Sequence, residues 1–532
     1  MYKNIIDLIE QAAGHYSDKV FSTDVFGQIT YGAFREKARI AGNQIRAKLG
    51  TDASEAGYPI AIFGEKSNDL LTLMMGSVYA GAFYVVLNPE QPAERLNQIL
   101  SVLDPKALIV SPDMACRASE LDFHCVTMDY SDLLEPTAES VSAAAGIDSE
   151  GYISRIPNGD TPLYGIFTSG STGTPKCVLI SHQDVVDFIG HFVTTFHFDE
   201  TCVIGNQAPF DFDVSVKDIY TALFAGASLV LIPREYFSTP PRLLDYLCDH
   251  HVTNLTWAVS ALCIISGLKG FSYRVPTDIR RVMFSGEVMP IRQLRIWQEN
   301  LPEASFVNLY GPTEITCNCM YYEIPNPYVS DHALPLGIPF AGRSIVLEDN
   351  GQVVAGPGAR GEICVRGESL ALGYYHNPEQ TDSHFIMEHV TGKMLTNGET
   401  GELTEIPAAD GPMVRTYHTG DLAEVGPDGQ IYFAGRKDFQ IKHMGHRIEL
   451  EEIEKDVEEI DGVTRCICSY HQERQRINAY FTGSIDKKEL HRRLKVLLPA
   501  YMIPNRFHHV EEFRLNKNGK VDRKVLEELI EI

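Results

Sequence analysis

The sequence contains no uncharged apolar run of 18 residues, so we expect no helix that crosses a membrane. Its N-terminus has acidic residues within the apolar stretch and no small-residue cleavage site behind it, unlike a secretory signal peptide. The 11 cysteines are odd in number and irregularly spaced, which favours reduced thiols over a disulfide framework. These absences predict a cytoplasmic protein without membrane insertion.

Positive charge is also scarce. The chain has 46 Lys and Arg against 71 Asp and Glu, a formal net charge of −25. A protein with this balance lacks the positive field that attracts phosphate backbones, which argues against nucleic acid as a partner. Any polyanion must therefore bind at a local patch. At 44% hydrophobic and 22% charged residues, the composition is typical of a globular protein, and 532 residues predict two or three folded units.

What the sequence does contain is an alternation of short apolar runs with amphipathic segments. We expect strands and helices that alternate as βαβ units with parallel sheets, so the core is α/β. The expected strands are 60–63, 84–87, 107–110, 222–232 and 282–284, and the expected helices are 32–49, 70–80 and 92–103.

The pattern changes after residue 330. Short alternating segments with Gly and Pro turns predict antiparallel hairpins in a barrel-like subdomain at 331–437. Helix and strand patterns return in the tail, with helices expected at 449–459 and 486–498 and strands at 466–471 and 477–481. The sequence therefore predicts a core domain at 1–437 and a small α+β domain at 438–532.

Two C-x-C pairs are candidate metal ligands. If Cys317 and Cys319, or Cys466 and Cys468, lie in strands, both side chains of the pair share one face. Neither pair has a second Cys or His pair at zinc-ligand spacing. We therefore interpret all four as packing residues.

The segment from Thr168 to Lys176, TSGSTGTPK, follows the apolar run 163–167. It has little to bury, but it offers flexible backbone N–H groups, hydroxyls and one ammonium, which are the groups that a polyphosphate needs. It lacks the Walker spacing, so Mg²⁺ must be held elsewhere. The alternative is a plain Ser/Gly linker. The expected phosphate-binding residues are Thr168, Ser169, Gly170, Ser171, Thr172, Gly173 and Lys176.

Further motifs follow this loop in a fixed order. They are Asn308-Leu-Tyr-Gly-Pro-Thr-Glu314, Gly361-Glu362, Gly373-Tyr374-Tyr375, Tyr417-His-Thr-Gly-Asp421, Gly435-Arg-Lys-Asp438, Gly445-His-Arg-Ile-Glu449 and Asn518-Gly-Lys520. With the loop, they make the chain resemble the adenylate-forming superfamily, in particular the amino-acid adenylation domains of nonribosomal peptide synthesis and the D-alanine–carrier protein ligases. The resemblance implies two stacked, mostly parallel α/β subdomains plus the barrel-like subdomain, and a mobile C-terminal domain.

The resemblance also implies a site for ATP and Mg²⁺. Tyr310 would stack on adenine, Thr313 would contact the α-phosphate, and Glu314 would hold the magnesium ion. Asp421 would accept the ribose hydroxyls, with Arg436 as a further ribose or phosphate contact. The alternatives are a surface turn with a packed tyrosine and an Asp421 that caps a turn. Asn308 and Gly311 complete the expected nucleotide set.

Three residues near the C-terminus are implied to act in different half-reactions. Lys520 would be the catalytic lysine, which offsets charge as the substrate carboxylate attacks the α-phosphate. Asp438 would be the hinge of the small domain, and Gly445 would line the tunnel for a phosphopantetheine arm. The usual Lys-hydrophobic-Arg-Gly of the family reads Lys442-His-Met-Gly445 in this sequence.

A segment after Phe210 matches the part of the family that binds the substrate. Phe212 precedes Asp213, which would bind the α-ammonium of an amino acid. The alternative is that Asp213 caps the following helix and pairs with Lys217. The pocket walls are mostly small or polar, so they favour a small, polar or acidic amino acid. They are Val214, Lys217, Thr256, Met283, Ser285, Leu309, Cys317 and Asn318.

These features predict an AMP-forming ligase that activates an amino acid as aminoacyl-AMP and transfers it to the phosphopantetheine thiol of a carrier protein. The chain ends 12 residues after Lys520, so we expect the carrier protein to act in trans. The alternative is an acyl-CoA ligase that uses free CoA, and a silent nucleotide-binding regulator is a third class. A basic segment, 487–495, is a candidate docking helix for an acidic carrier.

Overall fold

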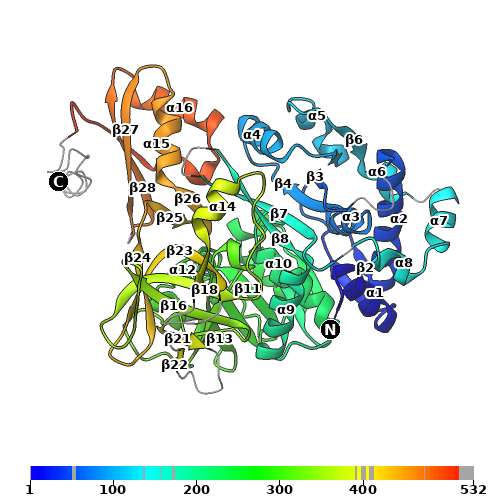
Figure 1. The fold of residues 1–532 in the computed structure, drawn as a ribbon, viewed down its shortest axis with the longest axis horizontal. Coiled ribbons are helices and arrows are strands. Elements are labelled where there is room, and N and C mark those ends of the chain that lie inside the picture. Colours follow the sequence, from blue (N-terminus) through cyan, green and yellow to red (C-terminus); the bar gives the residue numbers. More distant parts are fainter. Residues whose placement is uncertain are drawn as a thin grey trace.

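The computed structural model describes residues 2–50, 56–135, 138–156, 158–170, 174–389, 392–396, 403–406, 413–472 and 474–513. Two large α/β sheets, a curved antiparallel sheet and a smaller C-terminal α+β unit make up this part of the chain (Figure 1). The predicted fold class is confirmed.

One α/β sheet carries the phosphate loop, which joins two of its neighbouring strands. Its central strands are parallel and contain only buried residues, which is typical of strands covered by helices on both faces. The strand order is β19 (Gly373–Tyr374), β8 (Lys176–Ser181), β7 (Pro162–Thr168), β4 (Phe83–Leu87), β3 (Pro59–Phe63), β5 (Ala107–Val110) and β6 (Val126–Asp129).

The other α/β sheet carries most of the expected substrate pocket. It is parallel in its middle and antiparallel at both ends. The order is β15 (Ile338–Pro339), β14 (Met320–Ile324), β13 (Ser305–Tyr310), β12 (Arg281–Ser285), β11 (Asn254–Ala258), β9 (Val203–Asn206), β10 (Ser228–Leu231), β1 (Val20–Thr23) and β2 (Gln28–Thr30).

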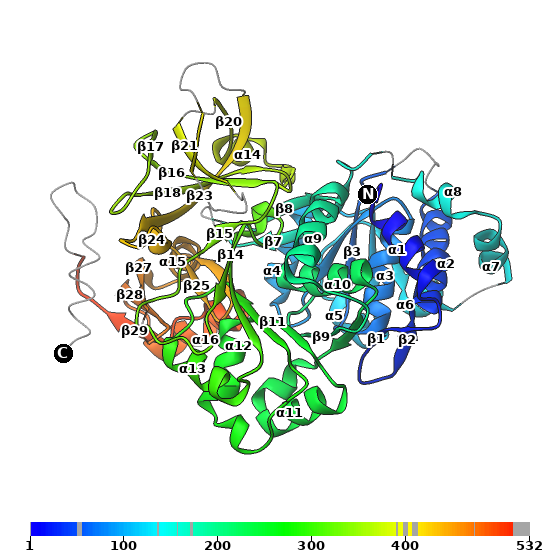
Figure 2. The same ribbon diagram turned by 90° about the horizontal axis from the view of Figure 1, so that it is seen from below.

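Helices cover both sheets, and two of them join the sheets into one hydrophobic core (Figure 2). Helix α9 contacts β8, and α10 contacts α9, β9, β10 and β11. The N-terminal helices are α1 (Ile5–His15), α2 (Tyr31–Leu49), α3 (Asn68–Tyr79), α4 (Ala93–Leu103), α5 (Ala115–Ala118), α6 (Tyr130–Leu134), α7 (Ala138–Ala145), α8 (Ser149–Ile153), α9 (His182–Phe196), α10 (Val214–Ala225), α11 (Pro240–Asp249), α12 (Val259–Gly267) and α13 (Ile291–Asn300).

The third sheet is antiparallel, as the hairpin pattern predicts. It follows the order β20 (Phe385–His389), β23 (Met413–Val425), β18 (Arg360–Gly367), β16 (Arg343–Asp349), β21 (Gly392–Thr396) and β22 (Leu403–Ile406), with β17 (Gln352–Val354) beside β16 and β24 (Ile431–Arg436) beside β23. Helix α14 (Pro378–His384) precedes β20.

Asp438 lies between two different sheets. Strand β24 before it belongs to the curved sheet, and β25 after it belongs to a separate hairpin. The C-terminal unit has its own apolar core. Its elements are β25 (Gln440–His443), β26 (His446–Glu449), α15 (Leu450–Glu458), β27 (Val463–His471), β28 (Arg476–Gly483), α16 (Lys487–Leu497) and β29 (Arg506–His509). The domain boundary at 438 and the mobility of this unit remain predictions.

One local expectation is wrong. The apolar run 222–232 is not one strand, because helix α10 continues to Ala225 and only Ser228–Leu231 forms β10. Cys317 lies outside the strands with φ +75°, so its pair with Cys319 is not a strand pair. Both are buried, as packing residues are. Cys466 and Cys468 do share the buried face of β27.

Candidate active site

The phosphate loop joins two antiparallel strands, with Thr168 of β7 opposite Lys176 of β8. A side chain at Gly170 would place its Cβ 2.1 Å from the carbonyl oxygen of Thr174, so only glycine fits there. Ser171, Thr172 and Gly173 lie outside the described residues. Strand β8 follows the loop and ends where a capping box of Ser181 and Asp184 starts helix α9.

Lys176 is buried at the start of β8, and its ammonium lies 4.7 Å from the ring centre of Tyr374. Burial, helped by the nearby Arg447, lowers the pKa of this lysine to about 8, and Glu314 opposes the shift. The loop therefore ends in a desolvated cation, which suits an anionic ligand.

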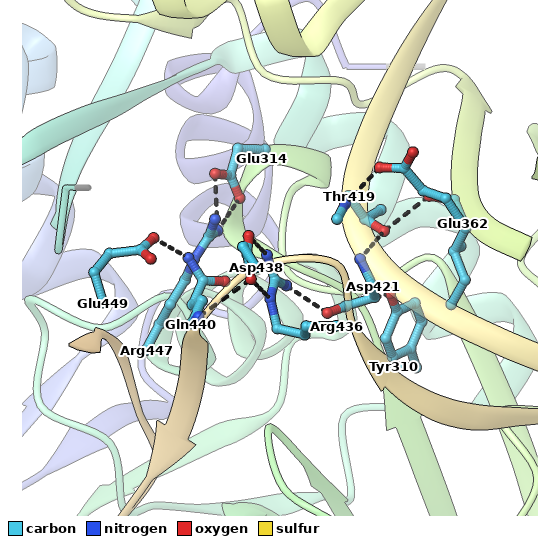
Figure 3. A network of polar contacts seen from close by, with 12 residues as sticks. Tyr310, Glu314, Glu362, Thr419, Asp421, Arg436, Asp438, Gln440, Arg447 and Glu449 are labelled. Atoms are coloured by element: carbon cyan, nitrogen blue, oxygen red, sulfur yellow. Dashed lines mark hydrogen bonds and ion pairs between the residues drawn. The ribbon is translucent and has the colours of Figure 1, made fainter. Parts of the chain in front are cut away.

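A second group of polar side chains links the Tyr310 motif to the hinge region (Figure 3). The hydroxyl of Tyr310 donates to Asp421 Oδ2 at 2.6 Å, and Arg436 Nη1 donates to Asp421 Oδ1. Arg436 also binds Asp438 through Nε and Nη2, at 2.6 and 2.7 Å. One guanidinium thus connects the expected ribose acceptor with the expected hinge.

These residues line a cavity of about 310 Å³. Asn308, Leu309, Tyr310, Asp421 and Arg436 line it from the core. The expected hinge residue and the β25 hairpin close its other side, with Asp438, Phe439 and Lys442 among the lining residues. The cavity combines aromatic rings, a carboxylate and cations, a mixture that suits a nucleoside with a phosphate group.

Glu314 lies beyond this cavity and is fully buried. Arg447 Nη1 donates to both of its carboxylate oxygens, at 2.8 and 2.7 Å, and the hydroxyl of Tyr374 donates to Oε1 at 2.8 Å. Burial raises the pKa of a carboxyl, but Arg447 and Lys176 outweigh it and lower the pKa of Glu314 to about 2. A buried, ionised carboxylate is the donor that Mg²⁺ prefers, so Glu314 fits a magnesium ion once Arg447 is elsewhere.

The turn that carries Asp421 is held by a carboxylate from the neighbouring strand. Glu362 Oε1 accepts from the backbone N–H of Gly420 at 2.8 Å, and Oε2 accepts from Lys437 Nζ at 2.7 Å. The Thr419 hydroxyl accepts from the Asp421 N–H at 3.0 Å. Burial opposes ionisation of Glu362, but His418 and Lys437 lower its pKa to about 2. These contacts fix the orientation of Asp421.

The C-terminal unit presents its β25 hairpin to the site. Gly445, with φ +82°, donates its N–H to Glu287 Oε1 at 3.1 Å, and a Cβ added to this glycine would lie 3.3 Å from Cβ of Ala258. The Ser169 hydroxyl donates to the carbonyl of Arg447 at 2.9 Å and accepts from the Glu449 N–H at 3.1 Å. Gly445 therefore faces the core.

The expected amino-acid pocket is buried and comes entirely from the N-terminal core. Lys217 is 1% exposed and donates to Asn318 Oδ1 at 2.7 Å and to Ser285 Oγ at 3.4 Å. It makes no ion pair with any residue that the structure describes. The other walls, Val214, Thr256, Met283, Leu309 and Cys317, are also buried.

Asp213 occupies the N-cap position of α10, but within the described part of the chain its side chain makes no capping hydrogen bond. Asp213 Oδ2 instead accepts from the Thr313 hydroxyl at 2.8 Å. Burial raises its pKa, and Lys217 and Thr313 oppose that shift. Phe212 beside it is half-buried, with its ring 5.6 Å from that of His446. The capping alternative for Asp213 is therefore wrong.

The structure brings together the described candidates from the phosphate loop, the Tyr310 motif, the Asp421 turn and the hinge region. Lys520 lies outside the described residues. Sequence reasoning gave no role to Arg447, Tyr374 or Glu362, although all three stand in quoted motifs. Lys442, which stands in the quoted Lys442-His-Met-Gly445 segment, also received no role, and Glu287 was missed because an isolated charge in a sequence does not reveal what it faces.

Comparison with known proteins bears on this site directly. The family model described as "AMP-binding enzyme" matches residues 9–375. The chain belongs to this family. As a member of it, the protein is an AMP-forming ligase, and the family implies that it uses ATP.

Two relatives and one solved structure are similar to this AMP-binding enzyme over nearly its whole length. It is 29% identical over 516 residues to "D-alanine--D-alanyl carrier protein ligase" of Listeria innocua, covering 94% of each chain. It is 31% identical over 534 residues to "Bacitracin synthase 1" of Bacillus licheniformis, covering 99% of this chain but 9% of that relative. The fold matches o-succinylbenzoate CoA synthetase of Bacillus subtilis with TM-score 0.80 at 18% identity, covering 98% of this chain and 98% of the other.

The described residues contain no helix that is both long enough and apolar enough to span a membrane.

Proposed function

We propose that this AMP-forming ligase joins an amino acid to ATP, forming aminoacyl-AMP and pyrophosphate, and then transfers the aminoacyl group to the phosphopantetheine thiol of a carrier protein, releasing AMP. The observation that carries the proposal is the buried Asp213 carboxylate, which lies within hydrogen-bond distance of Thr313. A buried carboxylate next to the expected α-phosphate contact suits the α-ammonium of an amino acid. The similarity to a D-alanyl carrier protein ligase supports this choice of substrate and acceptor.

In the first step the core residues bind and orient the reactants. The ring of Tyr310 stacks on adenine. Asp421 accepts hydrogen bonds from the ribose hydroxyls, which replace those that it accepts from Arg436 and Tyr310. Lys176 and the loop N–H groups stabilise phosphate charge. Glu314 would hold Mg²⁺, which when bound neutralises phosphate charge. Lys520 would offset the charge that develops at the α-phosphate, and the substrate carboxylate oxygen displaces pyrophosphate.

In the second step the hinge at Asp438 would turn the small domain, so that Gly445 replaces Lys520 at the core. The thiol reaches the acyl carbon by passing Gly445, which has no side chain to block its path. The sulfur forms the thioester bond, and the acyl–oxygen bond to AMP breaks. The contact of Gly445 with Glu287 and the close approach to Ala258 support this role.

For the substrate we propose a small, polar or acidic amino acid. Lys217 is a buried ammonium whose described partners are an amide and a hydroxyl oxygen, and a buried charge is costly without a counter-charge. A side-chain carboxylate of an Asp-like or Glu-like substrate would supply one. An amino-acid-dependent pyrophosphate exchange screen over D- and L-amino acids tests the proposal, and exchange with none of them would refute it.

The acceptor is tested separately, by supplying the activated amino acid with either free CoA or a phosphopantetheinylated carrier protein. Consumption of the carrier thiol supports the proposal. Consumption of CoA alone would instead identify an acyl-CoA ligase.

We propose that helix α16 contributes to carrier docking in trans. It carries Lys487, Lys488, Arg492, Arg493 and Lys495, and Arg492 and Arg493 both pair with Glu489 on its exposed face. Replacing Arg492 and Arg493 by Glu should slow loading of an acidic carrier about tenfold at low salt, with adenylation unchanged. The control is Lys37→Glu on α2. Loading that is equally fast in both variants would remove α16 from the docking surface.

A further inference from the structure

Residues of the C-terminal unit form hydrogen bonds with several groups that would otherwise be available to a nucleotide and its metal ion. Arg447, from strand β26, takes both oxygens of Glu314, the expected Mg²⁺ ligand. It also brings its own backbone to the phosphate loop, where its carbonyl accepts from Ser169. Figure 3 shows the Arg447 side chain directed at the carboxylate of Glu314.

The phosphate loop is engaged in the same way. The Ser169 hydroxyl is shared between the carbonyl of Arg447 and the N–H of Glu449. Glu452 is buried and pairs with Arg95 of α4. The Ser169 hydroxyl, which a polyphosphate would use, is thus bound to strand β26.

Arg447 and a metal ion cannot share Glu314 in this arrangement. Arg447 Nη1 lies within 2.8 Å of both oxygens, so it covers the chelating side of the carboxylate, while Tyr374 takes a further position on Oε1. Mg²⁺ needs oxygen ligands at about 2.0–2.1 Å. Lys176 is already close enough to lower the pKa of Glu314. A divalent ion beside two buried cations would be strongly repelled.

We propose that Arg447 is a built-in counter-cation for Glu314 that competes with Mg²⁺, so that docking of β26 and metal binding at Glu314 exclude each other. The inference rests on the proposed function only in taking Glu314 as the metal ligand. Its consequence is that the pose with Gly445 at the core forms when Glu314 carries no metal ion. Arg447 then replaces the lost positive charge and keeps Glu314 paired between the two half-reactions.

The first test measures binding without turnover. The probe is α,β-methylene-ATP, titrated calorimetrically into the full chain with either magnesium chloride or EDTA. Arg447→Gln should bind the magnesium form about tenfold more tightly than wild type, with a much smaller change in EDTA. Equal weakening in both conditions would mean that Arg447 contacts the nucleotide and would overturn the proposal. So would a wild-type protein that binds the analogue equally with and without magnesium.

The second test follows the pose by hydrogen exchange of peptides from 440–449, which contain the amides of Gly445 and Glu449. Magnesium with the analogue should speed their exchange in wild type, and Arg447→Gln should speed it without any nucleotide. Arg447→Lys, which keeps the charge, should fall between the two. Unchanged exchange in 440–449 would overturn the proposal.

Two controls separate competition from damage to the fold. Exchange in β27 and β28 should stay as in wild type, and increased exchange there in Arg447→Lys as well would mean a merely structural role. Glu314→Gln removes the core partner of Arg447. It should therefore also speed hydrogen exchange in 440–449, and it should abolish the increase in affinity that magnesium gives to the ATP analogue. These readouts contain no amino acid. A failed amino-acid screen would therefore refute the proposed substrate and leave this result standing.

Discussion

The amino-acid pocket and the nucleotide site differ in where their residues come from. Asp213, Lys217 and Asn318 all belong to the N-terminal core, and their side-chain hydrogen bonds stay within it. At the nucleotide site, Glu314 is paired by Arg447, and Asp421 by Arg436, on either side of the expected hinge. The pocket should therefore keep its chemistry whatever the small domain does, whereas the nucleotide site changes with every change of pose.

This difference predicts two classes of mutation. Changes in the core pocket should alter which acid is activated, and changes in the C-terminal unit should alter which half-reaction proceeds. A C-terminal variant that changed substrate preference would break the comparison.

The largest effect is expected from Lys520→Ala. Loss of a group that stabilises developing phosphate charge should slow single-turnover adenylation by about 10²–10³-fold, while thiolation from a preformed adenylate survives. The matched control is Lys517→Ala in the same basic segment. Equal losses in both half-reactions would contradict the use of two poses.

Gly445→Trp should do the reverse. The φ of +82° and the nearby Ala258 leave no room for a large side chain, so carrier acylation should fall about 10²-fold while pyrophosphate exchange persists. Met444→Trp changes the exposed neighbour and should have little effect. If both half-reactions fall together in Gly445→Trp, this residue does not line a tunnel.

Lys217→Met tests the pocket side of the comparison. If the enzyme activates acidic amino acids, loss of a buried charged hydrogen bond should lower kcat/KM for them by about 10–10²-fold. Ser285→Ala removes the longer of the two contacts and should cost less. If wild type prefers small neutral substrates and Lys217→Met ranks the substrates in the same order, the proposal of an acidic amino-acid substrate is wrong.

The smallest effect concerns His418, which supports the Asp421 turn through Glu362 and Glu388. The Glu362 carboxylate raises the pKa of His418 against the effect of burial, and Glu388 adds to the rise. The stabilisation should therefore be complete below the unfolded pKa of 6.5 and be lost as pH rises through the higher folded value. His418→Gln should lower the free energy of unfolding by about 1 kcal/mol at pH 6 and by less at pH 9. Denaturant titrations at both pH values measure this, and an equal loss at both would exclude the protonated pair.

Much of the molecule follows from local sequence. Continuous apolar runs such as Pro59–Phe63 specify buried parallel strands, and the Ser181–Asp184 capping box specifies where α9 begins. The motifs also indicated the AMP-binding family and most of its site. Where a helix-forming run and a β-forming run adjoin, as at 222–232, composition alone gave the wrong element, because the turn at Gly226 separates a helix from a strand.

The sequence by itself determined which side chains are able to carry the proposed chemistry, because glycine loops, carboxylates and cations have that chemistry wherever they lie. Only the tertiary structure decided their partners. Glu314 and Arg447 are 133 residues apart. The sequence around either residue does not indicate that both side chains are buried and paired with each other. Charges buried together must pair, and the pairing is set by how the small domain packs on the core.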